Sequence, residues 1–382
     1  MKIMIVIVGL IAAVSATGTS RAGEDSFNRL RQIATLPMAQ RQAAVDQFLT
    51  RIPENPFCKL GCDSLCIVYR GPGRDIRLAG DTTDWQPLPL MQHLPGTDLW
   101  YHLFANAPQG ARLDYKFVCD GVWKLDTRNP LTCMSGFGPN SEMRLHGYRP
   151  PPFVDHSDLP PCRLDTLTVP TPQLGGQRTV VVVRPAAPDD ANRPYLLVHD
   201  GLEYLTLADL AEAISWFQEF RADITLPICV CVPPGRRTEE YATDLQDDFG
   251  RFIADTLMPL IEARYGERGP WGSMGASYGG NISLYLARRY PERFDRVAVM
   301  SPSVAPAQHH GIAALDPTSL KLYVNWGTYD IQRLVPGCES FVHMLEDKGF
   351  EHLVEVKPQG HSWGFWRDSL SPAFRYLYAA SP

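Results

Sequence analysis

Three side chains that could share a proton lie far apart in this 382-residue sequence. Ser277 stands between two glycines in GASYG (275–279), a spacing that allows a sharp strand-to-helix turn with an exposed hydroxyl. Asp330 follows the apolar stretch KLYVNWGTY, and His361 follows HLVEVKPQG. A serine hydroxyl becomes a nucleophile when an imidazole accepts its proton and a carboxylate orients that imidazole. These residues therefore predict a triad for acyl transfer, with Ser277 as nucleophile, His361 as base and Asp330 as the orienting acid.

The order of the three residues along the chain supports this interpretation. Taken singly, Ser277 also suits a tight turn, Asp330 a helix N-cap and His361 a surface loop. Each follows an apolar run that predicts a buried strand, and functional groups of an open α/β sheet gather at the carboxyl ends of its strands. The order Ser, Asp, His is the one expected of the α/β-hydrolase fold. Their joint placement favours the triad over three separate explanations.

An acyl-transfer site also needs donors for the oxyanion that develops on the substrate. One donor is expected to be the backbone N–H of Tyr278, the residue after the nucleophile. The stretch VHDGLEY (198–204) follows an early predicted strand, and its Asp200-Gly201 pair permits a tight bend. That bend would aim the N–H of Leu202 into the site as the second donor, although an ordinary turn would have the same sequence.

The sequence shows two patterns of predicted secondary structure that must position these residues. Short alternating runs with turn signals between them predict an all-β, immunoglobulin-like sandwich. Later, near-continuous apolar strands alternate with amphipathic helices, which predicts a mostly parallel sheet with helices on both faces, an α/β hydrolase. The predicted layout is a signal peptide at 1–22, a helical lead-in at 23–57, the sandwich at 58–147, a proline-rich linker at 148–165 and the α/β domain at 166–382.

The first residues have the pattern of a cleaved signal peptide. Lys2 supplies a positive charge, residues 3–14 are apolar, and small residues follow. The apolar run is too short to span a bilayer comfortably. We therefore expect export to the periplasm or the medium, with no membrane span after cleavage.

The cysteine content bears on the compartment and on metal binding, and the net charge bears on possible partners. Nine cysteines fit an oxidising compartment. Cys58, Cys62 and Cys66 cluster, but no nearby histidine or paired C-x-x-C completes a zinc site, so disulfides are favoured and their pairing stays open. A formal net charge of −6 without a dense basic block argues against nucleic acid as a partner. The oligomeric state is not indicated.

Residues 163–380 resemble the esterase D / enterochelin esterase family of α/β hydrolases. Its motifs are matched by HDGLEY (199–204), the loop and helix at 236–266, GASYGG (275–280) and GHSWGFWRDSL (360–370). The resemblance implies the triad and oxyanion donors named above, with no cofactor and no metal. It also implies that Arg237 binds substrate and forms a supporting pair with Glu240 near the cleft. Trp363 and Trp366 would line the acyl or alcohol pocket, or else pack in the core.

The stretch from residue 76 to 130 resembles glycogen-binding and isoamylase-type modules, which are immunoglobulin-like (E-set) domains. In carbohydrate-binding members two tryptophans stack on sugar faces, while a lysine and an asparagine bind hydroxyls. The matching positions are Trp85, Trp123, Lys116 and Asn140. Such modules also occur without sugar binding, so a purely structural or cleft-forming role is the alternative.

Two departures bear on the substrate. Enterochelin esterases often have Glu where Asp330 stands, and an aromatic-rich segment where this chain has MSPSVAPAQHH (300–310). The pair His309-His310 suits a solvated loop better than a metal site. The leading hypothesis is an exported serine esterase acting on a siderophore or aryl ester. The alternatives are a feruloyl or acetyl xylan esterase directed to polysaccharide by the front domain, acyl transfer to another alcohol, and a non-catalytic carbohydrate-binding protein.

Overall fold

The computed structural model describes residues 20–52, 57–58, 64–105, 108–155, 158–186, 193–267 and 269–380. The predicted signal peptide (1–22) lies outside this part except for its last three residues, and Cys62 lies outside it as well. Within the described ranges, none of the helices combines the length and the apolar character that a membrane span requires.

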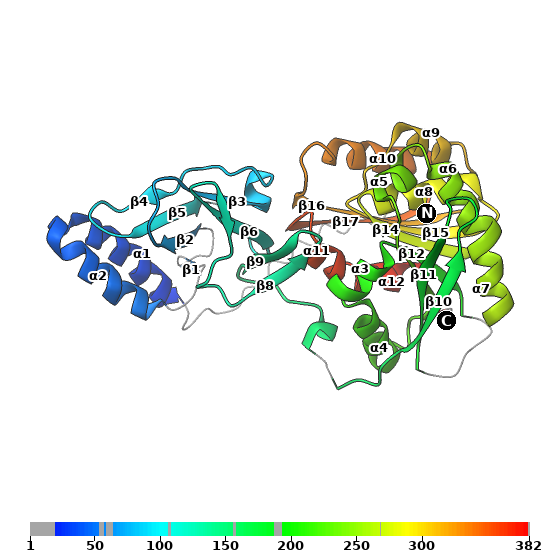
Figure 1. Cartoon of the computed structure of the whole chain (residues 1–382), viewed down its shortest axis with the longest axis horizontal. Helices are drawn as coiled ribbons and strands as arrows, with labels where there is room; N and C mark the ends of the chain where they lie inside the picture. Colours follow the sequence, from blue (N-terminus) through cyan, green and yellow to red (C-terminus); the bar gives the residue numbers. More distant parts are fainter. Residues whose placement is uncertain are drawn as a thin grey trace. The chain divides into compact units, whose positions relative to one another are not determined.

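The chain forms two compact units (Figure 1). The first runs to Arg149 and also takes in two short later segments, Thr328–Ile331 and Lys357–Ser362. The second holds Pro150–Gly327, Gln332–Val356 and Trp363–Pro382. The two later segments carry Asp330 and His361, which the predicted layout assigned to the α/β domain.

The first unit begins with two helices, α1 (Ser20–Thr35) and α2 (Met38–Arg51), in the stretch predicted as a helical lead-in. Their apolar side chains Ile33, Val45 and Phe48 are buried together with Val68 and Leu99. This burial, rather than helix propensity, stabilises helices of this length.

Two antiparallel sheets follow in the first unit. The strands of one sheet, in spatial order, are β1 (Phe57–Cys58), β2 (Ser64–Arg70), β5 (Leu99–Ala105) and β4 (Gln92–His93). In the other, β6 (Arg112–Cys119) pairs with β3 (Ile76–Gly80), β7 (Val122–Lys124) and β9 (Gly138–Arg144), and β9 pairs with β8 (Thr132–Ser135). A single core joins both sheets, with Ile67, Trp100, Leu78, Leu113 and Phe117 among its members. The predicted short strands are present, separated by turns and the 3-10 helix η1 (Asp81–Thr83).

The second unit is built on a mixed sheet. Its strands, in spatial order, are β10 (Arg163–Pro170), β11 (Gln177–Arg184), β13 (Ile228–Val232), β12 (Tyr195–His199), β14 (Trp271–Ala276), β15 (Phe294–Met300), β16 (Lys321–Tyr329) and β17 (Glu351–Gly360). The pairs β10–β11 and β11–β13 are antiparallel, and the pairs from β13 through β12, β14 and β15 to β16 are parallel. The last residues of β16 and β17 belong to the first unit.

Helices cover both faces of this sheet (Figure 1). On one face the core contains side chains of α6 (Gln246–Arg251), α7 (Met258–Tyr265), α8 (Tyr278–Arg289), α9 (Pro306–Ala313) and α10 (Val335–Lys348). On the other it contains side chains of α3 (Gly201–Leu207), α4 (Leu210–Phe220), α11 (Trp363–Asp368) and α12 (Leu370–Leu377). Strand β12 alternates between the two cores, Tyr195 and Leu197 in one and Leu196 and Val198 in the other. A strand buried on both faces therefore has the continuous apolar sequence seen here.

Two amphipathic stretches of the sequence do not form single regular α-helices. The first, at 206–220, is broken between α3 and α4, where Asp209 adopts a left-handed conformation with φ 52°. The helix expected at 244–266 contains a π-helical segment, Phe252–Leu257, between α6 and α7. Pro259 lies at the start of α7, and because proline has no N–H, the regular hydrogen-bond ladder cannot continue through it.

Candidate active site

Ser277 occupies a sharp turn between β14 and α8, as predicted. Its backbone has φ 57° and ψ −118°, a strained conformation for a residue with a side chain. A Cβ atom on Gly275 would lie 2.4 Å from the backbone of Gly279, so the turn closes only with glycine at position 275. The serine is half-buried, which leaves its side chain partly open to solvent.

Backbone hydrogen bonds hold this turn in place. The N–H of Ser277 donates to the carbonyl of Met300 at 2.9 Å, and the N–H of Ser303 donates to the carbonyl of Ser277 at 3.1 Å. Both partners flank the end of β15, the strand next to β14. The strain at Ser277, on the order of 1–3 kcal/mol, is thus held by the neighbouring strand.

The predicted oxyanion donors both lie in first turns of helices, where backbone N–H groups have no acceptor within the helix. Tyr278 is the first residue of α8, and Leu202 is the second of α3. Asp200, just before α3, is left-handed with φ 52°. A Cβ on Gly201 would lie 2.4 Å from the backbone of Cys231, so close packing on β13 requires the glycine of this bend.

Arg237 connects the bend before α3, which carries the predicted donor Leu202, to the turn that carries Ser277. Its Nε and Nη2 donate to the two carboxylate oxygens of Asp200, each at 2.7 Å, and Nη2 also reaches the carbonyl of Ala276 at 3.4 Å. Burial of Arg237 disfavours its charge, but the hydrogen bonds and charge of Asp200 outweigh this and raise its pKa. The Asp200 side chain is 3% exposed, and its backbone N–H donates to the Tyr241 hydroxyl at 3.1 Å.

The predicted pair between Arg237 and Glu240 is wrong. Glu240 instead accepts from Arg178 at 2.6 and 2.8 Å, and from the backbone N–H groups of Gly235 and Arg236 at 3.0 Å each. Burial raises the pKa of Glu240, and these donors more than compensate, so that the net shift is downward. The ionised carboxylate therefore holds the loop that leads into α5 (Arg237–Ala242). The sequence did not identify Asp200 as the partner because neighbours in a loop cannot be paired without the fold, and no motif marks Arg178.

Asp330 and His361 are brought together within the first unit. His361 Nδ1 lies 2.7 Å from Asp330 Oδ1, and the acid and base side chains are 1% and 13% exposed. The same Asp330 oxygen accepts the N–H of Ile331 at 2.8 Å, which fixes the carboxylate. A carboxylate on Nδ1 holds the imidazole in the tautomer whose Nε2 can accept a proton. Ser277 belongs to the second unit.

Trp363 and Trp366 are core residues, not pocket walls. They are 8% and 6% exposed and meet edge to face, with ring centroids 4.8 Å apart. Trp366 Nε1 donates to Ser301 Oγ at 3.2 Å, and Trp363 packs against Tyr204. Of the two predicted roles, the structure supports core packing.

The four predicted sugar-binding residues differ in exposure and in contacts. Trp85 and Trp123 lie nearly parallel, 17° apart with centroids at 6.5 Å, and Trp123 is 46% exposed. Lys116 is half-buried on β6. Asn140 is 5% exposed, and its amide donates to Asp114 Oδ2 at 3.3 Å. Its inclusion was wrong, because an amide committed to a buried carboxylate is not presented to a ligand.

Two further expectations changed. Cys66, Cys119, Cys162, Cys229 and Cys231 form no disulfide among the described residues, so the disulfide expected of Cys66 is not formed in the structure, and Cys62 lies outside the described residues. His309 and His310 lie in helix α9, not in a loop, with ring centroids 5.7 Å apart.

The mixed sheet, its helical layers and the serine on the strand-to-helix turn define an α/β-hydrolase-like protein. Residues 171–377 match the model of the Esterase family. Because this match covers more than half of the chain, the chain belongs to the Esterase family. The protein is therefore a carboxylic ester hydrolase.

The chain is similar in sequence or in fold to several known proteins. The uncharacterized protein YbbA of Bacillus subtilis (strain 168) is 28% identical over 241 residues, which cover 54% of this chain and 94% of that protein. The fold is similar to ferric enterobactin esterase from Salmonella typhimurium, with a TM-score of 0.71, 17% identity and coverage of 82% of this chain and 93% of that chain. For the enterobactin esterase FES from Shigella flexneri the corresponding values are 0.67, 18%, 82% and 92%. A ferulic acid esterase matches with a TM-score of 0.50 and 17% identity, over 57% of this chain and 97% of that one.

Proposed function

We propose that the protein is an exported serine esterase in which Ser277 attacks the ester carbonyl and forms an acyl-enzyme. The observation that carries this proposal is the 2.7 Å contact between His361 Nδ1 and Asp330 Oδ1. It supports a role for His361 as base, because the contact orients the ring for proton transfer at Nε2. The strained, half-buried Ser277 is the matching nucleophile.

In this mechanism His361 takes the proton of the Ser277 hydroxyl as the oxygen bonds to the carbonyl carbon. The backbone N–H groups of Tyr278 and Leu202 stabilise the oxyanion of the tetrahedral intermediate. The intermediate collapses, the carbon–oxygen bond to the alcohol breaks, and His361 passes its proton to the departing alkoxide. Water, deprotonated by the same imidazole, then releases the acid and restores Ser277.

Siderophore-type or aryl esters are the substrates that we favour. The similarity to enterobactin esterases extends over 82% of this chain, whereas the similarity to a ferulic acid esterase covers 57%. The longer match includes part of the front region, for which we propose the immunoglobulin-like E-set architecture. Because this chain and the enterobactin esterases match over both the front region and the catalytic region, we favour a related substrate for this chain.

A polysaccharide ester is the second candidate. The nearly parallel rings of Trp85 and Trp123, one of them exposed, favour it, because flat aromatic faces suit the apolar faces of pyranose rings. Lys116 is then the remaining polar partner. In this version the front region binds glucan or xylan and directs the esterase to feruloyl or acetyl groups.

Export is the third part of the proposal, and it is supported by the signal-peptide pattern of residues 1–22. Fractionation of cells expressing the full chain, with N-terminal sequencing of the product, tests it. A mature product in the cytoplasm that begins at Met1 would contradict export and leave the chemistry untouched.

A panel of esters tests the chemistry: a short acyl ester, a feruloyl ester and a catecholate trilactone, each with the wild type, Ser277→Ala and Ser283→Ala. Ser283 is a matched control, since it is a buried serine of α8, the helix that follows Ser277, and its hydroxyl donates to the carbonyl of Gly279. We expect Ser277→Ala to lose turnover and fluorophosphonate labelling, and Ser283→Ala to keep both. Turnover by Ser277→Ala would refute the mechanism, and absence of turnover and labelling in the wild type would favour a non-catalytic binding protein.

The same panel distinguishes the substrates. Preference for the trilactone without retention on polysaccharide supports the siderophore-type substrate. Retention on xylan or glucan that is lost on combining Trp85→Ala with Trp123→Ala supports the second candidate. Transfer of the acyl group to an alcohol instead of water would give an ester product in place of the carboxylic acid.

A further inference from the structure

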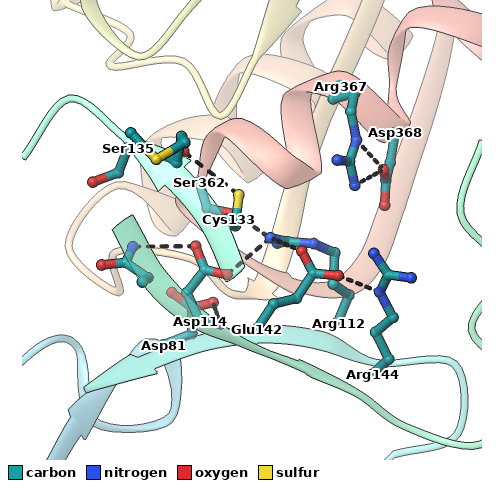
Figure 2. Close-up of polar contacts among 12 residues, drawn as sticks. Asp81, Arg112, Asp114, Cys133, Ser135, Glu142, Arg144, Ser362, Arg367 and Asp368 are labelled. Atoms are coloured by element: carbon teal, nitrogen blue, oxygen red, sulfur yellow. Dashed lines mark hydrogen bonds and ion pairs between the residues drawn. The ribbon is translucent and has the colours of Figure 1, made fainter. Parts of the chain in front are cut away.

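Strand β6 of the first unit carries buried charge on the face turned away from the apolar core. Leu113, Tyr115 and Phe117 point into the core, so Arg112 and Asp114 project from the opposite face. Both are nevertheless buried, as is Glu142 on the neighbouring strand β9 (Figure 2). Buried ions are costly unless other charges and hydrogen bonds compensate them.

The guanidinium of Arg112 is the centre of this cluster. Its Nη2 donates to Asp114 Oδ1 at 2.8 Å and to Glu142 Oε2 at 3.0 Å. Glu142 also accepts from Arg144, which is 31% exposed. The sulfur of Cys133 lies near the same two carboxylates, all within 4.8 Å, in an arrangement that resembles a metal site. Arg112 already supplies the cation there, and the cluster therefore does not require a metal.

The other arm of Arg112 reaches the segment that carries His361. Arg112 Nη1 donates to Ser362 Oγ at 3.1 Å, a contact between residues 250 positions apart (Figure 2). The backbones also pair, because Gln359 lies opposite Arg112 where β17 meets β6. The residue directly after the candidate base is thus hydrogen-bonded to a fully buried ion-pair cluster.

The residue directly before the base is held as well. A Cβ added to Gly360 would lie 2.0 Å from Asp81 Cγ and 2.2 and 2.3 Å from its carboxylate oxygens. Gly360 is not among the residues with positive φ, so space, not backbone conformation, requires the glycine. Asp81 is fixed in turn, because its oxygens accept the N–H of Asp114 at 2.7 Å and Trp85 Nε1 at 3.0 Å.

We propose that Arg112 and Asp81 are positioning residues for His361, which they hold through the two residues that flank it. The hydrogen bond to Ser362 and the buried carboxyl group of Asp81 against Gly360 restrict the backbone on both sides of the imidazole. This assignment rests on the proposed role of His361 as base. Because small displacements of a catalytic group lower the rate steeply, these two buried residues of the front unit act on kcat.

Kinetics of the full-length protein test the proposal. Ser362→Ala removes the hydroxyl that Arg112 binds, and we expect kcat to fall about tenfold with KM changed less than twofold. Gly360→Ala should lower kcat about a hundredfold. The double variant Gly360→Ala/Asp81→Ala has room for the new methyl group, so its kcat should recover at least about tenfold relative to Gly360→Ala. Such a recovery would show that the loss arises from the contact between position 360 and the Asp81 side chain.

Arg112 itself is examined with a conservative change, because deletion of its charge would leave buried carboxylates unpaired. Arg112→Lys keeps the charge but has one nitrogen in place of the fork, so we expect it to lower kcat as much as Ser362→Ala does. The double variant Arg112→Lys/Ser362→Ala should lose no more than either single variant. Arg144→Met is the matched control: it removes the other cation bound to Glu142 and should retain wild-type kcat.

The outcomes are separate from those of the proposed function. If folded Ser362→Ala and Gly360→Ala turn over esters at the wild-type rate, the positioning role is refuted while the esterase stands. Fully additive losses in both double variants would also refute it. Retention of activity by Ser277→Ala, in contrast, would overturn the esterase mechanism itself.

Discussion

Replacement of Arg237 by methionine separates two roles for this side chain. If Arg237 binds substrate, as its motif implied, its loss should raise KM. The structure shows instead a fork that clamps both oxygens of Asp200 at 2.7 Å and reaches the Ala276 carbonyl. We therefore expect Arg237→Met to act on the oxyanion loop, whose Leu202 follows Asp200 by two residues.

The size of the effect follows from burial. Removing one partner of a fully buried ion pair costs about 3–5 kcal/mol. The Arg237 side chain is 39% exposed although Asp200 is 3% exposed, so water can partly replace the lost donors. This lowers the expected cost to about 1–3 kcal/mol of folding free energy, or a Tm lower by roughly 2–12 °C. Misplacement of one oxyanion donor should reduce kcat about a hundredfold.

Steady-state kinetics on an activated ester, with thermal unfolding of the same samples, provide the measurement. Arg236→Met is the control, because Arg236 is the exposed neighbour and takes part in the loop through its backbone, whose N–H donates to Glu240 Oε1 and whose carbonyl accepts the N–H of Glu240. A large rise in KM at unchanged kcat would refute the clamp and restore a substrate-binding role. Equal losses in both variants would indicate damage to the loop as a whole.

Three further changes have expected outcomes. Asp330→Asn should lower kcat about 10³- to 10⁴-fold while the fold is kept by circular dichroism, because an amide does not stabilise the required tautomer of His361; a loss below tenfold would point to another acid. Gly275→Ala places a methyl group 2.4 Å from the Gly279 backbone, and should both lower the Tm and abolish fluorophosphonate labelling of Ser277. Burial, and then the charge of Asp114, raise the pKa of Asp81 to about 8, so the folded state holds a proton that the unfolded chain releases near pH 4. The free energy of unfolding should therefore fall as pH rises toward 8, and urea titrations at pH 5.5 and 7.5 should show a smaller fall for Asp81→Asn.

Much of the site was predictable because its signals are local. The spacing of Gly275, Ser277 and Gly279 predicts a tight turn, and the apolar runs before Asp330 and His361 predict strands whose ends meet at one edge of a sheet. The α/β alternation likewise depends on periodicity within each segment. Such local patterns can be recognised without knowing which segments pack against one another.

The missed features are pairings between segments. Arg237 could have paired with either Asp200 or Glu240, and only the fold shows that the nearer carboxylate in sequence is bound by Arg178. Asn140 occupies a position that suits sugar binding, but Asp114 is buried beside it. Trp363 and Trp366 are aromatic residues next to a catalytic motif, and their burial depends on helices far away in sequence.

The esterase-family region and the front unit contribute differently to this protein. The family match begins at residue 171, so it contains Ser277, Asp330 and His361 but neither Arg112 nor Asp81. The proposed reacting groups therefore lie in the part that matches the family model. In this chain the short segments that carry the acid and the base are packed within the compact unit of the front strands. The hydrogen bond between Arg112 and Ser362 joins residues 250 positions apart, and both partners are buried. Burial of the Arg112 charge costs desolvation free energy, which stabilisation of a loop alone does not explain. If the same contact determines where the imidazole lies, substitutions in the front strands should lower kcat more than they change KM.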